Sequence, residues 1–299
     1  MRVLAGALLA VATLLSTGAA RAFCRTTTVA TDPSFSPTNG QCWNEGIYVY
    51  HSRKCVGYSI ESPGSRKLDM TRFKELTEAA FATWETSACA SGKAPSIDAQ
   101  YVGDMPRSML GYDTKGGKNA SVIVFYDDAW PKGSTNEVIL TTLTFNKESG
   151  EILDADMEVN TAEIDFALSD PVPKDGTDMQ SALTHEVGHF FGLAHTSERT
   201  ATMFARYTPG STFFRDLSSD DVSGLCSVYI DGDQRTTSKG TVAGGACDPS
   251  APPAPVASSE GGCSATDNST AEGGIGLAAP LAIAFGVVAS RRRRRPPPR

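Results

Sequence analysis

Hydrophobic residues recur at helical spacing in one long stretch of the chain, residues 68–88. The apolar positions lie three or four residues apart: Phe73, Leu76, Ala80 and Trp84. This spacing places them on one face of an α-helix, and Asp69 just before them can cap its first turn. We therefore predict a helix that packs its apolar face, including Trp84, on a sheet.

Stretches rich in β-branched, aromatic or alternating residues predict the strands of that sheet. The predicted strands cover residues 46–51, 96–102, 120–126, 138–145 and 151–160. The last two flank a turn that ends in Gly150, so we expect them to form a hairpin. His51 ends the first stretch, and we interpret it as a strand residue and not as a metal ligand.

The second arm of this hairpin alternates apolar and polar side chains. The two sets are Leu153, Ala155, Met157, Val159 and Asp154, Asp156, Glu158, Asn160. A period of two predicts one buried face and one solvated face. The acidic row could instead bind Ca²⁺ through oxygen ligands, so both interpretations stay open.

Two further helices are predicted in the C-terminal half of the body. A loop over residues 170–178, which contains Pro and Gly, leads into the first of them. Thr177 or Asp178 can cap that helix. Ser218 can cap the second helix, which we expect to end near Tyr229.

Composition changes at both ends of the chain. Residues 1–22 combine an early arginine, an apolar run and a small-residue cleavage site, which is typical of a secretory signal peptide. Residues 231–272 are rich in Gly, Ser, Thr, Ala and Pro, which predicts a flexible linker. Residues 273–290 are uncharged and, as a helix of roughly 27 Å, would cross a bilayer.

The predicted organisation is therefore one domain over residues 23–230 between a signal peptide and a linker with a tail, residues 273–299. Arginines at 291–295 follow the apolar run at once, and we expect them to stay on the cytoplasmic side of a membrane. The alternative, a nucleic-acid patch, is disfavoured because no basic segment continues from them.

Net charge excludes some partners. The chain carries 27 basic and 34 acidic residues, a net of −7. Eight of the basic residues lie in the two end segments, so residues 23–272 hold 19 basic and 34 acidic residues, a net of −15. Such a body should repel nucleic acid and anionic membrane surfaces.

Cysteine usage is typical of an exported protein with disulfides. The seven cysteines are Cys24, Cys42, Cys55, Cys89, Cys226, Cys247 and Cys263. None forms a Cys-x-x-Cys pair, so a cysteine zinc site is disfavoured. Without Cys263 six remain, which suits three disulfides with 15 possible pairings. We favour Cys42 with Cys55, expect Cys226 to tie down the last helix, and expect Cys24 in a disulfide rather than on a metal.

The strongest chemical signal is a histidine cluster in residues 184–196. His185 and His189 are four residues apart, so on a helix both imidazoles reach one ion from one side. Gly192 lets the chain leave the helix, and the next turn can bring His195 round as a third ligand. Three protein nitrogens leave a fourth tetrahedral position for water, as in catalytic zinc sites. Glu186 is placed to take a proton from that water.

This motif, His-Glu-x-x-His-x-x-Gly-x-x-His, resembles that of the metzincin metalloproteases and, more closely, their matrixin branch. Met203, eight residues after His195, is similar to the methionine that forms a hydrophobic floor below the zinc ligands. Tyr207 resembles the tyrosine near the specificity pocket, although Ala205 replaces the usual proline. Residues 217–225 are similar to the start of the last matrixin helix.

The resemblance implies an α+β fold, a metzincin-like catalytic domain with a twisted mixed five-stranded sheet and about three helices. It also implies a zinc-dependent endopeptidase with one catalytic Zn²⁺ on His185, His189 and His195, Glu186 as general base and Met203 as structural support. Matrixins carry a second zinc held largely by histidines, but only His51 is spare here. We expect a monomer that acts on protein or peptide substrates.

Two alternatives remain open. The first is a surface or adhesion module that keeps zinc for stability only. The second is a zinc hydrolase that acts on cell-wall peptides. An open three-histidine site beside a glutamate is poorly explained by stability alone, which favours the endopeptidase.

The tail adds a second resemblance. Gly262-Cys263-Ser264, a spacer, the apolar run and the arginine cluster resemble a myxobacterial-type C-terminal sorting tail. This implies export, handling at Cys263, and display at the cell surface on the outer envelope through the tail or release outside the cell.

Overall fold

The computed structural model describes residues 23–32, 34–37, 41–115, 119–132, 137–230, 234–237, 240–243 and 281–287. The predicted signal peptide, residues 1–22, lies outside the described residues. The same holds for most of the predicted linker and tail.

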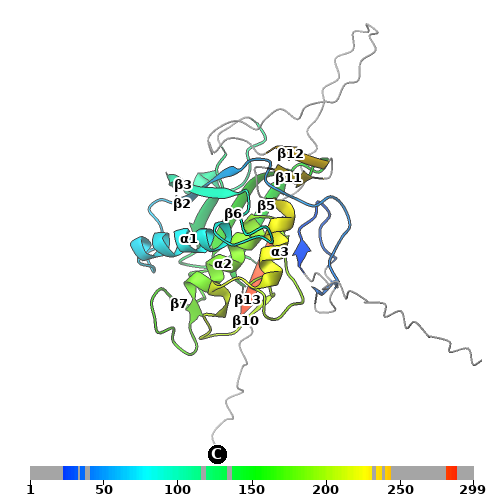
Figure 1. Cartoon of the computed structure of the whole chain (residues 1–299). Coiled ribbons are helices and arrows are strands. Elements are labelled where there is room, and N and C mark those ends of the chain that lie inside the picture. The colour runs from blue at the N-terminus through cyan, green and yellow to red at the C-terminus, as the bar shows by residue number, and fades with distance from the viewer. Residues whose placement is uncertain are drawn as a thin grey trace, which may run out of the picture.

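A mixed sheet forms the centre of the molecule (Figure 1). Its five main strands are β2 (Cys55–Glu61), β3 (Asp98–Met105), β4 (Val122–Phe125), β5 (Glu137–Phe145) and β6 (Ile152–Val159). They lie in the order β5-β6-β4-β2-β3, with β5 antiparallel to its neighbour β6 and the other pairs parallel. The predicted α+β class and mixed five-stranded sheet are confirmed.

Two more strands extend the sheet beyond β5. β13 (Leu281–Val287) pairs antiparallel with β5, and β10 (Arg206–Tyr207) pairs parallel with β13. The helix expected over residues 273–290 is therefore wrong for this part, because residues 281–287 form a strand in the sheet. An apolar segment without charges can satisfy its backbone groups against a sheet edge as well as within a helix. Among the described residues, no helix is long and apolar enough to cross a membrane.

Three α-helices are present in the described residues: α1 (Met70–Glu85), α2 (Met179–Phe190) and α3 (Ser219–Val228). The predicted caps are confirmed. Asp69 accepts hydrogen bonds from the backbone N–H groups at the start of α1, and Asp178 does so for α2. Ser218 caps α3 in a reciprocal arrangement with Asp221.

Helices α1 and α2 lie side by side across one face of the sheet (Figure 1). Trp84 is fully buried between them, and its indole N–H donates to the carbonyl of Thr184 at 2.7 Å. Phe81 of α1 packs edge-on against Phe190 of α2. The apolar face predicted for residues 68–88 thus serves as the platform on which α2 rests.

Short elements complete the described chain. They are β1 (Cys24–Arg25), η2 (Arg107–Met109), β7 (Phe166–Ala167), β8 (Thr177–Asp178), β9 (Leu193–Ala194), η3 (Phe213–Arg215), β11 (Gln234–Thr237) and β12 (Gly240–Ala243). β1 pairs with β9, which ties the N-terminal segment of the domain to the chain just after α2.

The first strand of the sheet is not where the pattern predicted it. Residues 46–51 make only isolated bridges through Tyr48 and Tyr50, whereas β2 begins at Cys55. β2 is paired on both sides, with β3 and β4. Its residues from Tyr58 onward are also buried on both faces of the sheet, so alternation gave no signal.

The acidic row of β6 is buried, and the predicted solvated face is wrong. Asp154, Asp156 and Glu158 are 3%, 2% and 2% exposed. Asp156 accepts hydrogen bonds from the backbone N–H groups of Gly111 and Val122. Burial raises the pKa of Asp156. The segment after β3 covers this face, which the sequence of β6 alone did not indicate. Calcium binding at this row stays a prediction.

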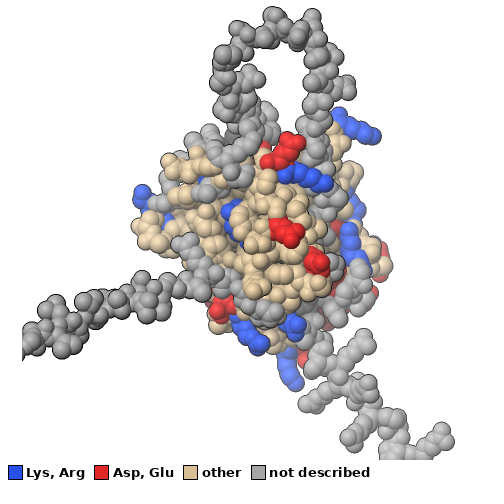
Figure 2. All heavy atoms as spheres, turned by 90° about the vertical axis from the view of Figure 1, so that its right-hand side faces the viewer, with Lys and Arg blue, Asp and Glu red and all other residues tan. Residues whose placement is uncertain are grey.

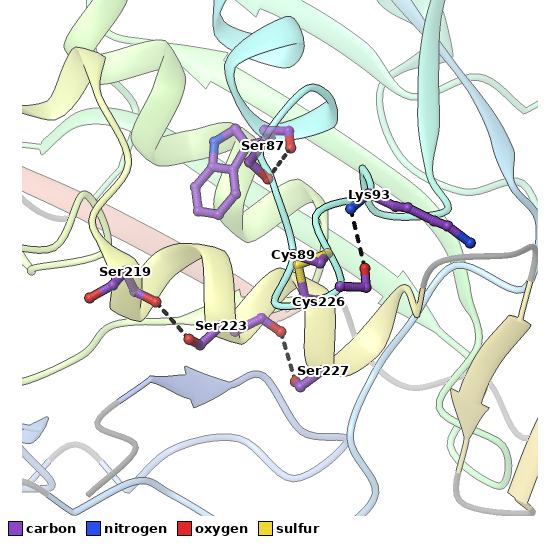
Figure 3. Close-up of a disulfide and its surroundings, with 10 residues drawn as sticks. Ser87, Cys89, Lys93, Ser219, Ser223, Cys226 and Ser227 are labelled. Atoms are coloured by element: carbon purple, nitrogen blue, oxygen red, sulfur yellow. Dashed lines mark hydrogen bonds between the residues drawn. A yellow bond between two sulfur atoms is a disulfide. The ribbon is translucent and has the colours of Figure 1, made fainter. Parts of the chain in front are cut away.

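Disulfides pair Cys24 with Cys42 and Cys89 with Cys226, so the predicted Cys42–Cys55 pair is wrong. Pairing of β1 with β9 sets the N-terminal segment, and its Cys24 lies beside Cys42, with a Cα–Cα distance of 5.2 Å. Figure 3 shows Cys226 of α3 bonded to Cys89 in the loop after α1, as expected for the last helix. Cys55 is also disulfide-bonded.

On the face seen in Figure 2, acidic and basic side chains of the described residues are interspersed among uncharged ones.

Candidate metal centre

Helix α2 presents the first two histidines. The carboxylate of Asp178 accepts a hydrogen bond from the N–H of Ser181 at 2.9 Å and so fixes the start of the helix. Arg215 donates two further hydrogen bonds to the same carboxylate, at 2.6 and 2.8 Å. Since His185 and His189 are one turn apart, both rings project from one side of this anchored helix.

A sharp turn brings the third histidine to the other two. Gly192 has a φ of +87°, a region that favours glycine, and an added Cβ would lie 3.1 Å from the carbonyl oxygen of Val49. The next two residues form β9, which pairs antiparallel with β1. The N–H of Thr196 donates to the carbonyl of Met203 at 3.0 Å, which fixes the turn that carries His195.

The three imidazoles converge on one point. Nε2 of His195 lies 3.2 Å from Nε2 of His185 and 3.2 Å from Nε2 of His189. His185 and His189 are buried, and His195 is partly exposed. The structure thus brings together all three histidines that the motif singled out.

Hydrogen bonds at Nδ1 fix the tautomers of His185 and His189. Nδ1 of His185 lies 2.6 Å from the carbonyl oxygen of Thr202, and Nδ1 of His189 lies 2.9 Å from that of Leu193. A carbonyl only accepts, so each Nδ1 carries the proton and donates. Each Nε2 therefore points a lone pair at the common centre, as a metal ligand requires.

Burial keeps the cluster neutral. Loss of solvation lowers the pKa of His185 and His189 well below the ordinary value, and the neighbouring histidines lower the pKa of His185 further. Burial also lowers the pKa of His195 to about 4. Neutral imidazoles are the form that binds metals.

Zinc fits this donor set. Two nitrogens bound tetrahedrally at about 2.0–2.1 Å would lie roughly 3.3 Å apart, close to the two separations of 3.2 Å. Three nitrogen donors without a carboxylate also suit zinc better than non-haem iron. When bound, the ion would be held by His185, His189 and His195.

Glu186 lies fully buried next to the first histidine. One carboxylate oxygen, Oε2, accepts a hydrogen bond from the hydroxyl of Thr141 in β5 at 2.5 Å. The other oxygen, Oε1, is buried without a hydrogen-bond partner. Burial raises the pKa of Glu186 well above its ordinary value, although the Thr141 bond opposes this shift. A basic oxygen without a partner is suited to accept a proton from water.

Met203 forms the floor expected from the motif. It is 2% exposed, and its sulfur lies where a Cβ on Gly188 would be, at only 2.2 Å. Asp221 fixes this turn, because its carboxylate accepts from the N–H groups of Thr202 and Met203 at 2.8 and 3.0 Å.

Tyr207 and Phe214 line the neighbouring side of the centre. The hydroxyl of Tyr207 accepts from the N–H of Asp178 at 2.9 Å and donates to the carbonyl of Ser211 at 2.6 Å. The ring of Phe214 lies 6.0 Å from that of His185. The sequence predicted a place near the site for Tyr207 only. Thr141, Phe214 and Asp221 were missed, since no local motif marks them.

Comparison with known proteins agrees with this geometry. The family model Peptidase_M10, described as Matrixin, matches residues 50–230, more than half of the chain. A probable matrix metalloproteinase, 095L, of Invertebrate iridescent virus 3 is 28% identical over 117 residues, 38% of this chain and 30% of its own length. Metalloendoproteinase 1-MMP of Arabidopsis thaliana is 36% identical over 110 residues, 36% of this chain and 29% of that protein.

Human matrilysin is 37% identical over 54 residues, which cover 18% of this chain and 20% of matrilysin. The chain thus spans less than a third of the length of these relatives.

Proposed function

Because the chain belongs to the matrixin family of zinc metallopeptidases, we propose that it is a zinc-dependent endopeptidase that hydrolyses proteins outside the cell. The observation that carries the proposal is the convergence of three Nε2 lone pairs beside a buried carboxylate oxygen without a partner. A zinc site that serves stability alone is closed by a fourth protein ligand and does not need such an oxygen beside it.

Each residue of the site would have a separate role in peptide hydrolysis. A zinc ion bound by the histidines would supply Lewis acidity, which polarises the scissile carbonyl and lowers the pKa of water to roughly 7. Glu186 accepts a proton from that water and then donates it to the leaving amine. Thr141 holds one oxygen of Glu186 so that the other faces the reacting water. Met203 supports the histidines and takes no part in proton transfer.

The experiment compares Glu186→Ala with Glu148→Ala, an exposed control on the β5–β6 turn. We expect Glu186→Ala to retain zinc by elemental analysis and to lose at least about a hundredfold in casein cleavage, as typical for a general base. The control should cleave casein at the parent rate. Full activity in Glu186→Ala would refute the assigned role.

Two other functions were considered from the sequence. A zinc-stabilised adhesion module would bind zinc and cleave nothing, with or without chelator. A hydrolase of cell-wall peptides would cleave peptidoglycan stems and leave casein intact. Profiling the parent chain on a peptide library, on casein and on purified peptidoglycan separates all three functions.

Export and surface display belong to the same proposal. The disulfides support an oxidising destination, and the leader-like residues 1–22 would direct the chain there. The tail with Cys263 would sort the protein to the outer envelope or release it. Treating intact cells with protease and detecting the domain by antibody would test surface display, because a protein inside the cell is protected.

A further inference from the structure

The sheet edge nearest the metal centre is covered by a strand from the far end of the chain. β13 pairs antiparallel with β5 from Leu281 opposite Leu143 to Phe285 opposite Ile139. Its last residue, Val287, pairs in parallel with Tyr207. Without β13, β5 would be an edge strand, and its outward N–H and C=O groups would be open to another extended chain.

Both neighbours of β13 belong to the metal centre. Thr141, which lies opposite Ile283 in the β5 register, donates its hydroxyl to Glu186. Tyr207, on the other side, packs against Phe214, whose ring lies beside His185. Helix α2 also contacts β13, and Figure 1 shows β13 running next to α2. The tail strand therefore runs beside the elements that carry the candidate catalytic residues.

An extended peptide that adds to a sheet edge is held by its main chain, with side-chain pockets for selectivity. β13 is held in this way: one side pairs with β5 over five successive positions and the other with β10. Its sequence, Leu-Ala-Ile-Ala-Phe-Gly-Val, carries no charge. It thus has the length, the extended shape and the position of a bound substrate.

We propose that residues 281–287 occupy the edge of β5 along which an extended substrate would bind, and so hold the enzyme in a self-inhibited state. Self-inhibition rests on the proposed peptidase function, because only an active enzyme can be inhibited. The docking of the strand beside β5 does not depend on that function. A tethered segment competes at a high effective concentration, so even a weakly binding tail excludes soluble substrates. While residues 281–287 pair with β5 they cannot lie in a membrane, so sorting of the tail would free this edge of β5.

The first test breaks the strand in the full-length chain. In a β-strand, successive N–H groups point to opposite sides, so the double variant Ile283→Pro/Ala284→Pro must remove one N–H that faces β5. The matched control, Leu277→Pro/Ala278→Pro, places two prolines before β13. We expect cleavage of a short fluorogenic peptide to rise about tenfold in the strand variant only. Amide exchange of residues 139–143 should accelerate in that variant only.

The two readouts separate the two proposals. Faster β5 exchange in the strand variant, with no peptide cleavage in any protein, would support the docked tail and reject the peptidase. Unchanged exchange and an unchanged cleavage rate, in an active parent, would overturn the docked tail.

The second test locks the strand in place and does not depend on proline tolerance. Thr142 and Ala282 are directly opposed, a spacing that a disulfide can bridge. Thr142→Cys/Ala282→Cys should form a crosslinked monomer on a non-reducing gel and should be activated about tenfold by mild reductant. The two single variants and the parent, given the same reductant, serve as controls. Failure to crosslink, or full activity when crosslinked, would contradict the proposal.

Discussion

At the scale of single residues, the site depends on contacts that no local rule requires. Gly188 lies inside the histidine motif, where glycine disfavours a helix. Its position against Met203 and Trp84 explains it: a Cβ there would lie 2.2 Å from the methionine sulfur and 2.8 Å from the tryptophan ring. The helix thus approaches its floor more closely than any side chain permits.

Gly188→Ala should therefore destabilise the domain despite the better helix propensity of alanine. We expect a loss of about 2–3 kcal/mol, the range for overpacked cores, together with weaker zinc retention. Urea unfolding and zinc content after dialysis measure the two effects. Gln180→Ala on the same helix is the control, and equal stability of both variants would contradict the packing argument.

Thr141 is the second residue whose role is positional. Thr141→Val keeps the shape of the side chain and removes the hydrogen bond to Glu186. Hydrogen bonds to charged groups contribute about 1.5–3 kcal/mol, so kcat should fall roughly tenfold or more with zinc content unchanged. Thr141→Ser keeps the hydroxyl and should recover most of the rate. Loss of zinc in Thr141→Val would show a structural role instead.

At the scale of elements, helix α2 depends on helix α1, against which it packs. Helix α1 ends at Glu85, whose carboxylate accepts the N–H of Ala99 in β3 at 2.6 Å. Burial raises the pKa of Glu85 to about 7, the Ala99 bond opposes this shift, and the charge of Asp98 adds to it. This junction joins the helix platform to the far edge of the sheet.

The shift predicts a pH-dependent stability. The folded pKa of Glu85, about 7, exceeds the reference value of 4.5, so the protonated acid favours the folded state. Its contribution is complete below pH 4.5 and is lost as pH rises through 7. Glu85→Gln should be more stable than the parent by about 1–2 kcal/mol at pH 8, with the difference vanishing near pH 4.5. Urea unfolding across this range, with Glu78→Gln on the exposed side of α1 as control, measures it.

At the scale of the whole molecule, the metal centre joins parts of the fold that are distant in sequence. The ligands come from α2 and from the turn after β9, the floor from Met203, and the brace from Asp221 in α3. Zinc would therefore stabilise the whole domain by binding only its folded form.

Removing zinc should lower the melting temperature. Free zinc at a hundred times its Kd adds about 2.7 kcal/mol of stability, so chelator should lower Tm by several degrees and zinc should restore it. His185→Ala should abolish the response to zinc. His51→Gln is the control, because His51 is buried against the carbonyl of Phe190 and lies outside the cluster. A zinc response that survives in His185→Ala would contradict the three-histidine site.

Local patterns located several elements of the fold well. Helix α1, its cap at Asp69 and the β5–β6 hairpin agree with the structure within a few residues. β2 was missed because a strand buried on both faces has no alternating pattern. The acidic side of β6 was wrongly predicted to be solvated. The segment around Gly111 buries it, and that segment is distant in the sequence.

The chemistry of the centre was determined by the sequence itself, since His185 and His189 one turn apart, Gly192 and His195 act through short-range geometry. The tertiary structure alone decided which groups surround them: the sulfur of Met203 against Gly188, the hydroxyl of Thr141 on Glu186, and the tail strand beside β5. Spacing along the chain sets the direction of a side chain within one helix or turn. Which distant segment it meets depends on packing of the whole fold, and no local pattern encodes that.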